Sequence, residues 1–203
     1  MPKQVDADAR RGELAAATRR VILRRGLEGS TLREVAREAG WSIGVLAHYF
    51  ETKDELLRYS LADPAWVMNR FDSTEPDGLT SVRRILERLL PLSSEMRDMW
   101  QVWMTFWVSW PGDASWDRER RQRQRKFRRF CRGLILHVVE RGEFDARIDA
   151  ERDGDALATL LHGLGVQAVL DPRGWPQRRQ LEALDAFFAA RLPSGSVEVA
   201  TCG

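Results

Sequence analysis

Side chains that can contact nucleic acid are concentrated between positions 31 and 53. Ser42, Ile43, Gly44, Val45 and His48 share one short segment. Hydroxyl groups can hydrogen-bond base edges, aliphatic groups can meet the thymine methyl group, and glycine lets a DNA backbone approach closely. Ser42, Ile43, Val45 and His48 are therefore predicted to face bases in a major groove, with Gly44 allowing close approach to the duplex.

A second set of residues in the same stretch is suited to phosphate groups. Thr31, Tyr49 and Lys53 can bind phosphates, which fix the register of a protein on DNA without reading sequence, and Arg33 can add to the patch. Each has a simpler interpretation. Tyr49 could be a packing residue, and Lys53 could be a solvated surface lysine.

The elements that must position these residues are short helices. Thr31 with Glu34, and Thr52 with Glu55, have the spacing of capping boxes at helix starts. Ala39-Gly40 can end the helix between them, because glycine adopts the left-handed conformation, and Ser42 can cap the next helix. This pattern predicts a helix-turn-helix.

Composition restricts the class of protein. The 203 residues are 43% hydrophobic and 31% charged, as in a soluble globular protein, and with no membrane span or signal peptide in view a cytoplasmic location is expected. The net charge of +2 means that any DNA binding must come from a local patch. Two distant cysteines and three scattered histidines predict no disulfide or metal site. We find no catalytic motif and expect no cofactor.

Hydrophobic periodicity of 3.6 residues runs through the chain, so the predicted fold is all-α with about nine helices. The predicted organisation is a flexible tail (1–9), a helix-turn-helix domain (10–62), a helical ligand-binding and dimerisation domain (63–192) and a second tail (193–203). Within it, helices are expected over 10–25, 116–141, 156–170 and 177–192. Asp63-Pro64 should end or kink a helix near the domain junction.

The helix-turn-helix stretch resembles the N-terminal signature of TetR-family transcriptional regulators. The matching positions are Gly26, Thr31, Val35-Ala36, Ala39-Gly40, Ser42, Gly44, Leu46, Tyr49-Phe50, Lys53 and Leu56. Residues 100–107 and 156–172 are similar to the C-terminal domain of the BetI-like branch. The resemblance implies a homodimer that represses transcription and leaves its operator when a small molecule binds. Two positions depart from the family pattern, Trp41 and Ala47.

Dimerisation would place two reading helices about one DNA turn apart, so a pseudo-palindromic operator is expected. The two late helices should form the interface, through Leu157, Leu160, Leu161, Leu164, Leu184, Phe187 and Phe188. The alternative is that these faces only close the core of a single chain.

Eight tryptophans suggest a binding site for the effector. Trp100, Trp103 and Trp107 share one helical face, close to Met96 and Met104, which are soft and adaptable. With Trp66 and Phe71 they are predicted to line an apolar cavity for a small apolar, aromatic or cationic molecule. The alternative is ordinary core packing.

Three further alternatives remain open. The nine basic residues between Arg118 and Arg132 could form a nucleic-acid patch, although a solvated helix face is expected. The DNA-reading head could be vestigial in a small-molecule-binding protein. The regulator could also be an activator, because the same reading head serves both activities.

Overall fold

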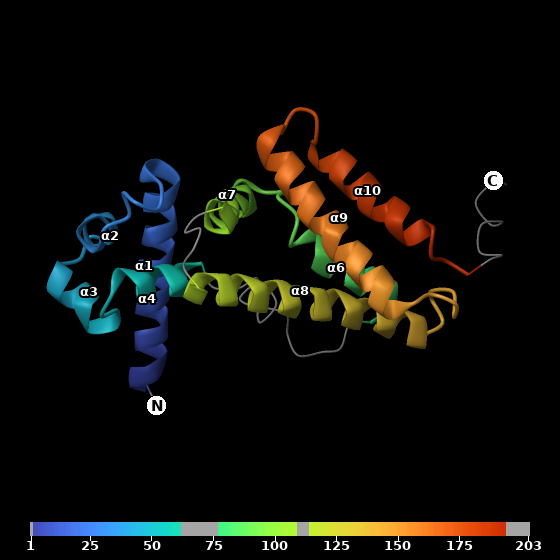
Figure 1. Ribbon diagram of the computed structural model, residues 1–203, viewed down its shortest axis with the longest axis horizontal. Helices are drawn as coiled ribbons and strands as arrows, with labels where there is room; N and C mark the ends of the chain where they lie inside the picture. The colour runs from blue at the N-terminus through green and yellow to red at the C-terminus, as the bar shows by residue number, and fades with distance from the viewer. Residues whose placement is uncertain (1, 62–76, 109–113, 194–203) are drawn as a thin grey trace. The chain divides into compact units, whose positions relative to one another are not determined.

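The computed structural model describes residues 2–61, 77–108 and 114–193, with side chains from residue 7 onward. These residues form nine α-helices and no strand (Figure 1), which confirms the all-α prediction. The helices are α1 (Pro2–Arg25), α2 (Leu32–Ala39), α3 (Ile43–Tyr49), α4 (Lys53–Ser60), α6 (Gly78–Glu87), α7 (Ser94–Val108), α8 (Ala114–Glu140), α9 (Ala150–Leu170) and α10 (Gln177–Ala189). In the described part of the chain, no helix is long and apolar enough to cross a membrane.

The described helices belong to two compact units. The first contains α1 to α4 and residues 98–108 of α7, and the second contains α6, residues 94–97 and α8 to α10. Some predictions fall outside the described residues, namely the Asp63-Pro64 break, the domain junction, Trp66, Phe71 and the tail after residue 193.

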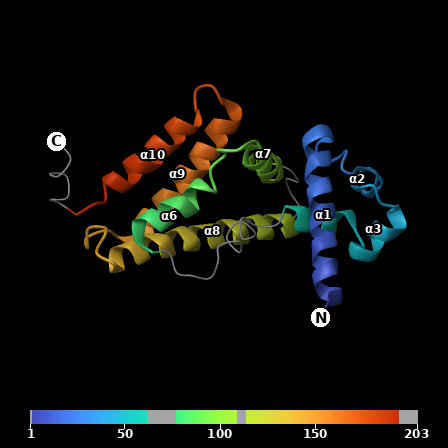
Figure 2. The same cartoon turned by 180° about the vertical axis from the view of Figure 1, so that it is seen from behind.

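In the first unit, α1 provides the surface on which the short helices pack. Both views show α2 and α3 on the same side of α1 (Figures 1 and 2). The core consists of Leu14, Ala17, Val21, Val35, Ala36, Leu46, Phe50 and Leu56, all nearly inaccessible to solvent. Helices as short as α2, α3 and α4 are marginal in isolation, so this shared core must hold them.

Two helices begin earlier than the sequence suggested. α1 starts at Pro2, so the tail predicted over residues 1–9 is wrong for residues 2–9, which continue the helix. α9 starts at Ala150 rather than at 156, because the Asp149 side chain accepts hydrogen bonds from the backbone N–H groups of Glu151 and Arg152. An N-cap of this kind extends a helix over polar residues that carry no hydrophobic periodicity.

The second unit is built on the packing of α8 against α9. Gly154 of α9 lies so close to Arg132 of α8 that an added Cβ would be 2.5 Å from the Arg132 Cα atom. The Arg132 guanidinium also pairs with Asp155 through two hydrogen bonds of 2.8 Å. Next to this contact, Cys131 is fully buried, and desolvation raises the pKa of its thiol to about 12.

Candidate nucleic-acid interface

The turn between α2 and α3 fixes the position of the reading helix. Gly40 has φ +73°, and its N–H donates to the Arg37 carbonyl at 3.2 Å, while the Trp41 N–H donates to the Ala36 carbonyl at 2.8 Å. These two bonds form a Schellman motif, which needs a residue that tolerates the left-handed conformation. Ser42 Oγ then accepts the Val45 N–H at 3.3 Å and starts α3. Both helix boundaries that the sequence predicted here are confirmed.

The capping boxes form only in part. Thr31 and Thr52 do cap α2 and α4, accepting the N–H groups of Glu34 and Glu55. The reciprocal bonds differ from the prediction, because the Thr31 N–H donates to the Gly29 carbonyl and Glu55 accepts the N–H of Glu51. The threonines therefore provide the caps, and the glutamates are available for ion pairs.

α3 has one buried anchor and an otherwise exposed surface. Leu46 is fully buried, whereas Ile43 and Val45 are 51% and 44% exposed, two of the few large hydrophobic side chains on the described surface. Ser42 and His48 are exposed beside them. A DNA major groove offers thymine methyl groups to exposed aliphatic side chains such as these. The structure thus brings the predicted base-reading residues onto one accessible helix.

Arg11 of α1 braces the end of α3, a role that sequence reasoning missed. Its Nη2 atom donates to the Tyr49 carbonyl at 2.8 Å and to Glu55 Oε1 at 3.2 Å. Its guanidinium also lies 5.0 Å from the centre of the Phe50 ring. One arginine therefore links α1, α3 and α4. Its sequence position, one polar residue among several on α1, carries no signal of this contact.

The aromatic residues around α3 pack together. The rings of Trp41 and Tyr49 are 5.7 Å apart, and both pack against the core of the first unit. His48 meets the edge of Tyr49 at 5.3 Å. Trp41 is therefore a helix-packing residue. Tyr49 is half-buried, and its hydroxyl makes no hydrogen bond within the described residues, so it remains available to a phosphate.

Lys53 is engaged within the fold. Its Nζ donates to the carbonyls of Leu27 and Glu28, at 2.9 and 3.2 Å, just after the end of α1. An ammonium group has three donors, so one remains for a phosphate. Thr31 is exposed and accepts one bond as a cap, which leaves its hydroxyl proton free to donate. Both residues can serve the fold and a bound duplex together.

Charges on α2 are partly neutralised by α1. Glu38 pairs with Arg20 and Arg24 across the two helices, and these hydrogen bonds lower the pKa of its carboxyl to about 2. Arg37 pairs with Glu34 on α2 itself. Arg33 is exposed and forms no hydrogen bond or ion pair with any described residue, so its charge is available to DNA.

The residues predicted to bind an effector lie largely inside the protein. Trp100 and Trp103 of α7 are buried, and Met96, Met104 and Trp107 are half-buried. The ring centres of Trp103 and Trp107 lie 5.4 and 5.8 Å from that of Trp100, in edge-to-face arrangements. Trp103 Nε1 is buried and has no hydrogen-bond acceptor among the described residues, which is costly for a polar group.

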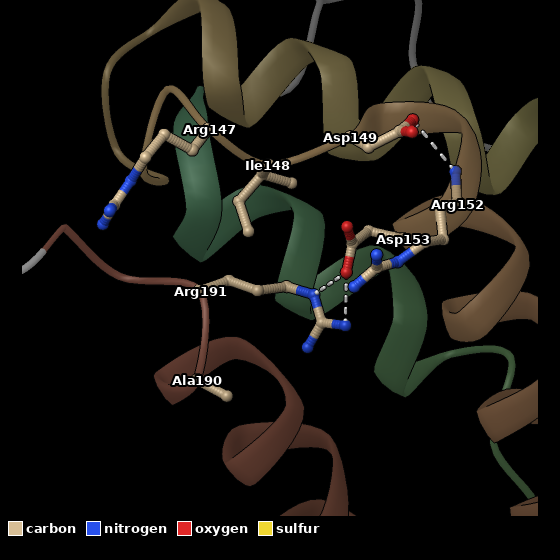
Figure 3. Close-up of a pocket in the computed structure, with 7 residues that line it drawn as sticks. All are labelled: Arg147, Ile148, Asp149, Arg152, Asp153, Ala190 and Arg191. Carbon is tan, nitrogen blue, oxygen red and sulfur yellow. Dashed lines mark hydrogen bonds and ion pairs between the residues drawn. The ribbon is translucent and has the colours of Figure 1, made fainter.

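A pocket that the structure describes lies elsewhere, in the second unit. It has a volume of about 280 Å³ and is lined by Arg147, Ile148, Asp149, Arg152, Asp153, Ala190 and Arg191 (Figure 3). Arg191 binds Asp153 through Nε and Nη2, at 2.9 and 2.6 Å. None of the predicted effector residues lines this pocket. Among the described residues, no cluster of three or more His, Cys, Asp or Glu side chains could hold a metal ion.

The predicted dimer residues are mostly used within the chain. Leu157, Leu161, Leu164, Leu184 and Phe188 are buried in the single chain, and only Leu160 and Phe187 are partly exposed. The outward stripe of α9 consists of Ala156, Thr159, Leu160, Gly163, Gln167 and Leu170. A partner would therefore meet a neighbouring face of the same helices, rotated from the predicted one.

Comparisons with known proteins agree with this arrangement of elements. Residues 14–59 match the model for bacterial regulatory proteins of the tetR family, and residues 79–193 match the BetI-type transcriptional repressor C-terminal domain. The HTH-type transcriptional regulator PksA of Bacillus subtilis is 34% identical over 181 residues, which is 85% of this chain and 84% of that protein.

Solved structures show the same fold. A transcriptional regulator from Rhodococcus has a TM-score of 0.71 at 27% identity, over 89% of this chain and 95% of that one. A regulator from Saccharomonospora viridis, in complex with choline, has a TM-score of 0.74 at 23% identity, over 91% of this chain and 98% of the other. With a reading helix held against a three-helix core and both family domains matched, the chain belongs to the TetR family of DNA-binding transcriptional regulators.

Proposed function

We propose that the protein is a homodimeric repressor that reads a pseudo-palindromic operator through α3 and leaves it when a small molecule binds. The observation that carries this proposal is the exposure of Ile43 and Val45 on a helix anchored from below by Leu46. A regulator of chromosomal genes acts in the cytoplasm, and we place the protein there.

Base reading is assigned to Ser42, Ile43, Val45 and His48, with Gly44 allowing the backbone of α3 to approach the duplex. Gly44 is exposed, and the nearest atom to an added Cβ would be Ser42 Oγ at 3.9 Å. Its lack of a side chain is therefore not needed by the fold, which supports a role in contact with DNA. Phosphate contacts are assigned to Thr31, Arg33, Tyr49 and Lys53.

Dimerisation is assigned to the outward faces of α9 and α10. Leu170 is 69% exposed, and Leu160 and Phe187 are partly exposed. Gly163 lies on the same stripe of α9 with no described atom within 4 Å of an added Cβ. A glycine in that position lets a second helix approach closely, which supports an interface there.

Effector binding is assigned to the tryptophan face of α7. Trp103 Nε1 lacks an acceptor, so a ligand that places an oxygen there would satisfy a buried donor. The edge-to-face rings of Trp100 and Trp107 can accept a flat or cationic group. The choline complex of the Saccharomonospora viridis regulator makes choline the first compound to test.

The experiment that tests operator reading is selection from a randomised duplex pool at two salt concentrations. We expect an enriched pseudo-palindrome whose affinity falls steeply with salt. The matched variants are Ile43→Ala, which should change the enriched sequence, and Val108→Ala, at another exposed aliphatic residue, on α7, which should not. A folded wild-type protein that enriches no sequence would overturn the proposed function and favour a vestigial head.

The enriched duplex then allows effectors to be screened by release of DNA, beginning with choline. For any compound that releases DNA, Trp103→Phe keeps an aromatic ring and removes the N–H. We expect the concentration needed for release to rise by about 2- to 10-fold, the value of one hydrogen bond. An unchanged concentration would exclude Trp103 as a ligand contact.

A further inference from the structure

The long helix α8 carries a stripe of cations on one exposed face. Arg118, Arg121, Arg125, Arg128 and Arg129, here called the basic stripe, recur at three, four, three and one residues, which is helical spacing for a single face. All five are exposed. The buried residues of α8 point the other way, and they are Trp116, Phe127, Cys131, Leu134, Ile135 and Val138.

The basic stripe lacks counter-charges, unlike its neighbours on α8. Arg120 and Arg123 pair with Asp117 and Glu119, and Arg132 pairs with Asp155 and Glu151. By contrast, no hydrogen bond or ion pair joins any of the five stripe arginines to the part of the chain that the structure describes. The pKa of Asp155 is lowered mainly by its hydrogen bonds with Arg132, and the charge of Arg128 adds a smaller contribution.

This placement is unfavourable in the free protein. Arginines three and four residues apart on a helix repel one another. Along the stripe, Arg118 and Arg121 are three residues apart, and Arg121 and Arg125 are four apart. A polyanion laid along the stripe would relieve this repulsion.

We propose that the basic stripe is a second DNA-contact surface, which binds phosphates of the duplex in addition to the helix-turn-helix. From Arg118 to Arg129 the stripe runs about 16 Å, so its five arginines are on average about 4 Å apart along the helix axis. One DNA strand presents a phosphate about every 3.4 Å along its axis. The contact carries no sequence information, because it involves only the backbone.

DNA fits this surface better than other polyanions do. An amphipathic helix that binds a membrane needs an apolar face for the bilayer, whereas most large apolar residues of α8 are buried within the fold and Leu136 is the one classed as exposed. The protein is a DNA-binding regulator, so duplex DNA is the polyanion that its first unit binds. The inference depends on binding to duplex DNA and not on the operator sequence or the effector.

The test compares two triple variants of the full chain that each lose three positive charges. The first is R118Q/R121Q/R125Q, and the matched control is R84Q/R152Q/R173Q, three exposed arginines outside the basic stripe. Glutamine has a helix propensity similar to that of arginine, so both variants should fold, which circular dichroism checks. The probe is a random-sequence 40-base-pair duplex, titrated between 50 and 300 mM KCl.

In the stripe variant we expect the magnitude of the slope of log K against log salt to fall by about 2 to 3, and binding at 0.1 M salt to be at least about tenfold weaker. In the control, the slope should change little. R118K/R121K/R125K should retain wild-type binding. Equal losses in both triple variants, or no loss in either, would overturn the proposal. Loss of binding to vesicles containing phosphatidylserine, with DNA binding intact, would also overturn it and assign the stripe to a membrane.

The result can be separated from that of operator reading. Wild-type protein that binds random duplex through the stripe, yet enriches no sequence from a pool, would contradict the proposed function and support the second surface. The opposite outcome is also distinct. If the stripe variant enriches the same operator as the wild type, equally well and with the same salt slope, the proposed function stands and the second surface is rejected.

Discussion

At the scale of single residues, Lys53 shows how one side chain can serve both fold and ligand. Its type and spacing allowed a phosphate contact to be predicted. Its bonds to the Leu27 and Glu28 carbonyls could not be predicted, because they join α4 to a turn 25 residues earlier in the sequence. Arg11 is a similar case, since its partners lie 38 and 44 residues away. Long-range contacts of polar groups leave no periodic signal in a sequence.

The two roles of Lys53 can be separated by replacing it with methionine. We expect Lys53→Met to lower the free energy of unfolding by about 1 kcal/mol, because two hydrogen bonds to partly exposed carbonyls are lost. We also expect the salt slope of DNA binding to fall by about 1 for each chain. Chemical denaturation and fluorescence anisotropy measure the two effects.

Lys53→Arg is the control for charge, and it should keep most of the salt slope. If Lys53→Met destabilises the fold but leaves the slope of the folded protein unchanged, the lysine is only a structural link between α4 and the end of α1.

At the scale of helices, the sequence identified the elements well but not which face each presents. The caps of α2, α3 and α4 are local, so Thr31, Ser42 and Thr52 could be assigned from spacing alone. The leucines of α9 were also recognised as an apolar face. Which apolar face packs inside one chain and which meets another depends on how α8 and α9 cross, and residue spacing does not encode that crossing.

Gly163 offers a direct test of the outward stripe of α9. An added side chain there meets no described atom within 4 Å, so Gly163→Leu should fold, and its helix propensity favours stability. We expect it to block close approach of a second chain and to shift the mass in solution from two chains towards one. Sedimentation at micromolar concentration measures this shift.

Gly133 on α8 is the matched control, because an added Cβ there also meets nothing within 4 Å. Gly133→Leu should leave the mass unchanged. A Gly163→Leu protein with the mass of the wild type would remove this stripe from the interface.

The contact of α8 with α9 also predicts a dependence of stability on pH. The His162 ring lies 4.8 Å from Phe127, and burial lowers its pKa to about 4. The unfolded chain binds this proton near pH 6.5, so between pH 6.5 and 4 the unfolded state holds more protons and the folded state loses stability as pH falls. The loss attributable to His162 should be about 2 kcal/mol, an order-of-magnitude value.

Urea denaturation of wild type and His162→Phe at pH 7 and pH 4.5 measures this effect. The difference in stability between the two proteins should shift in favour of the variant at the lower pH, and His162→Gln provides a second comparison if phenylalanine packs poorly. His48→Gln, at an exposed position, should show no such shift. A pH response in His162→Phe equal to that of the wild type would contradict the assignment.

At the scale of the whole molecule, the proposed dimer would convert a seven-residue helix into a specific reader. α3 alone spans about 10 Å and can meet only a few base pairs. The family fold could be recognised from the sequence, because the turn glycine, the caps and the core of the first unit are all local. The proposed dimer surface could not be distinguished from ordinary exposed helix until the buried faces of α9 and α10 were known. The basic stripe could not be distinguished until it was known which arginines of α8 have acidic partners.

Half-site spacing tests this organisation. Inserting five base pairs between the half-sites of a selected operator rotates one reading helix by half a turn of DNA. We expect affinity to fall by at least about a hundredfold, to a level near that of a single half-site. Gel mobility shift measures this loss. The reference for single half-site affinity is an operator in which one half-site is reversed. Undiminished binding after the insertion would show that the two heads do not read one site together.

The buried thiol of Cys131 can report how often the second unit opens. Only a thiolate reacts readily with alkylating reagents, and here the group is both protonated at neutral pH and inaccessible. In a Cys202→Ser chain, labelling of Cys131 would occur only when α8 separates from its neighbours, so the labelling rate would count opening events. Repeating the measurement with DNA or an effector present would show how each changes the frequency of that opening.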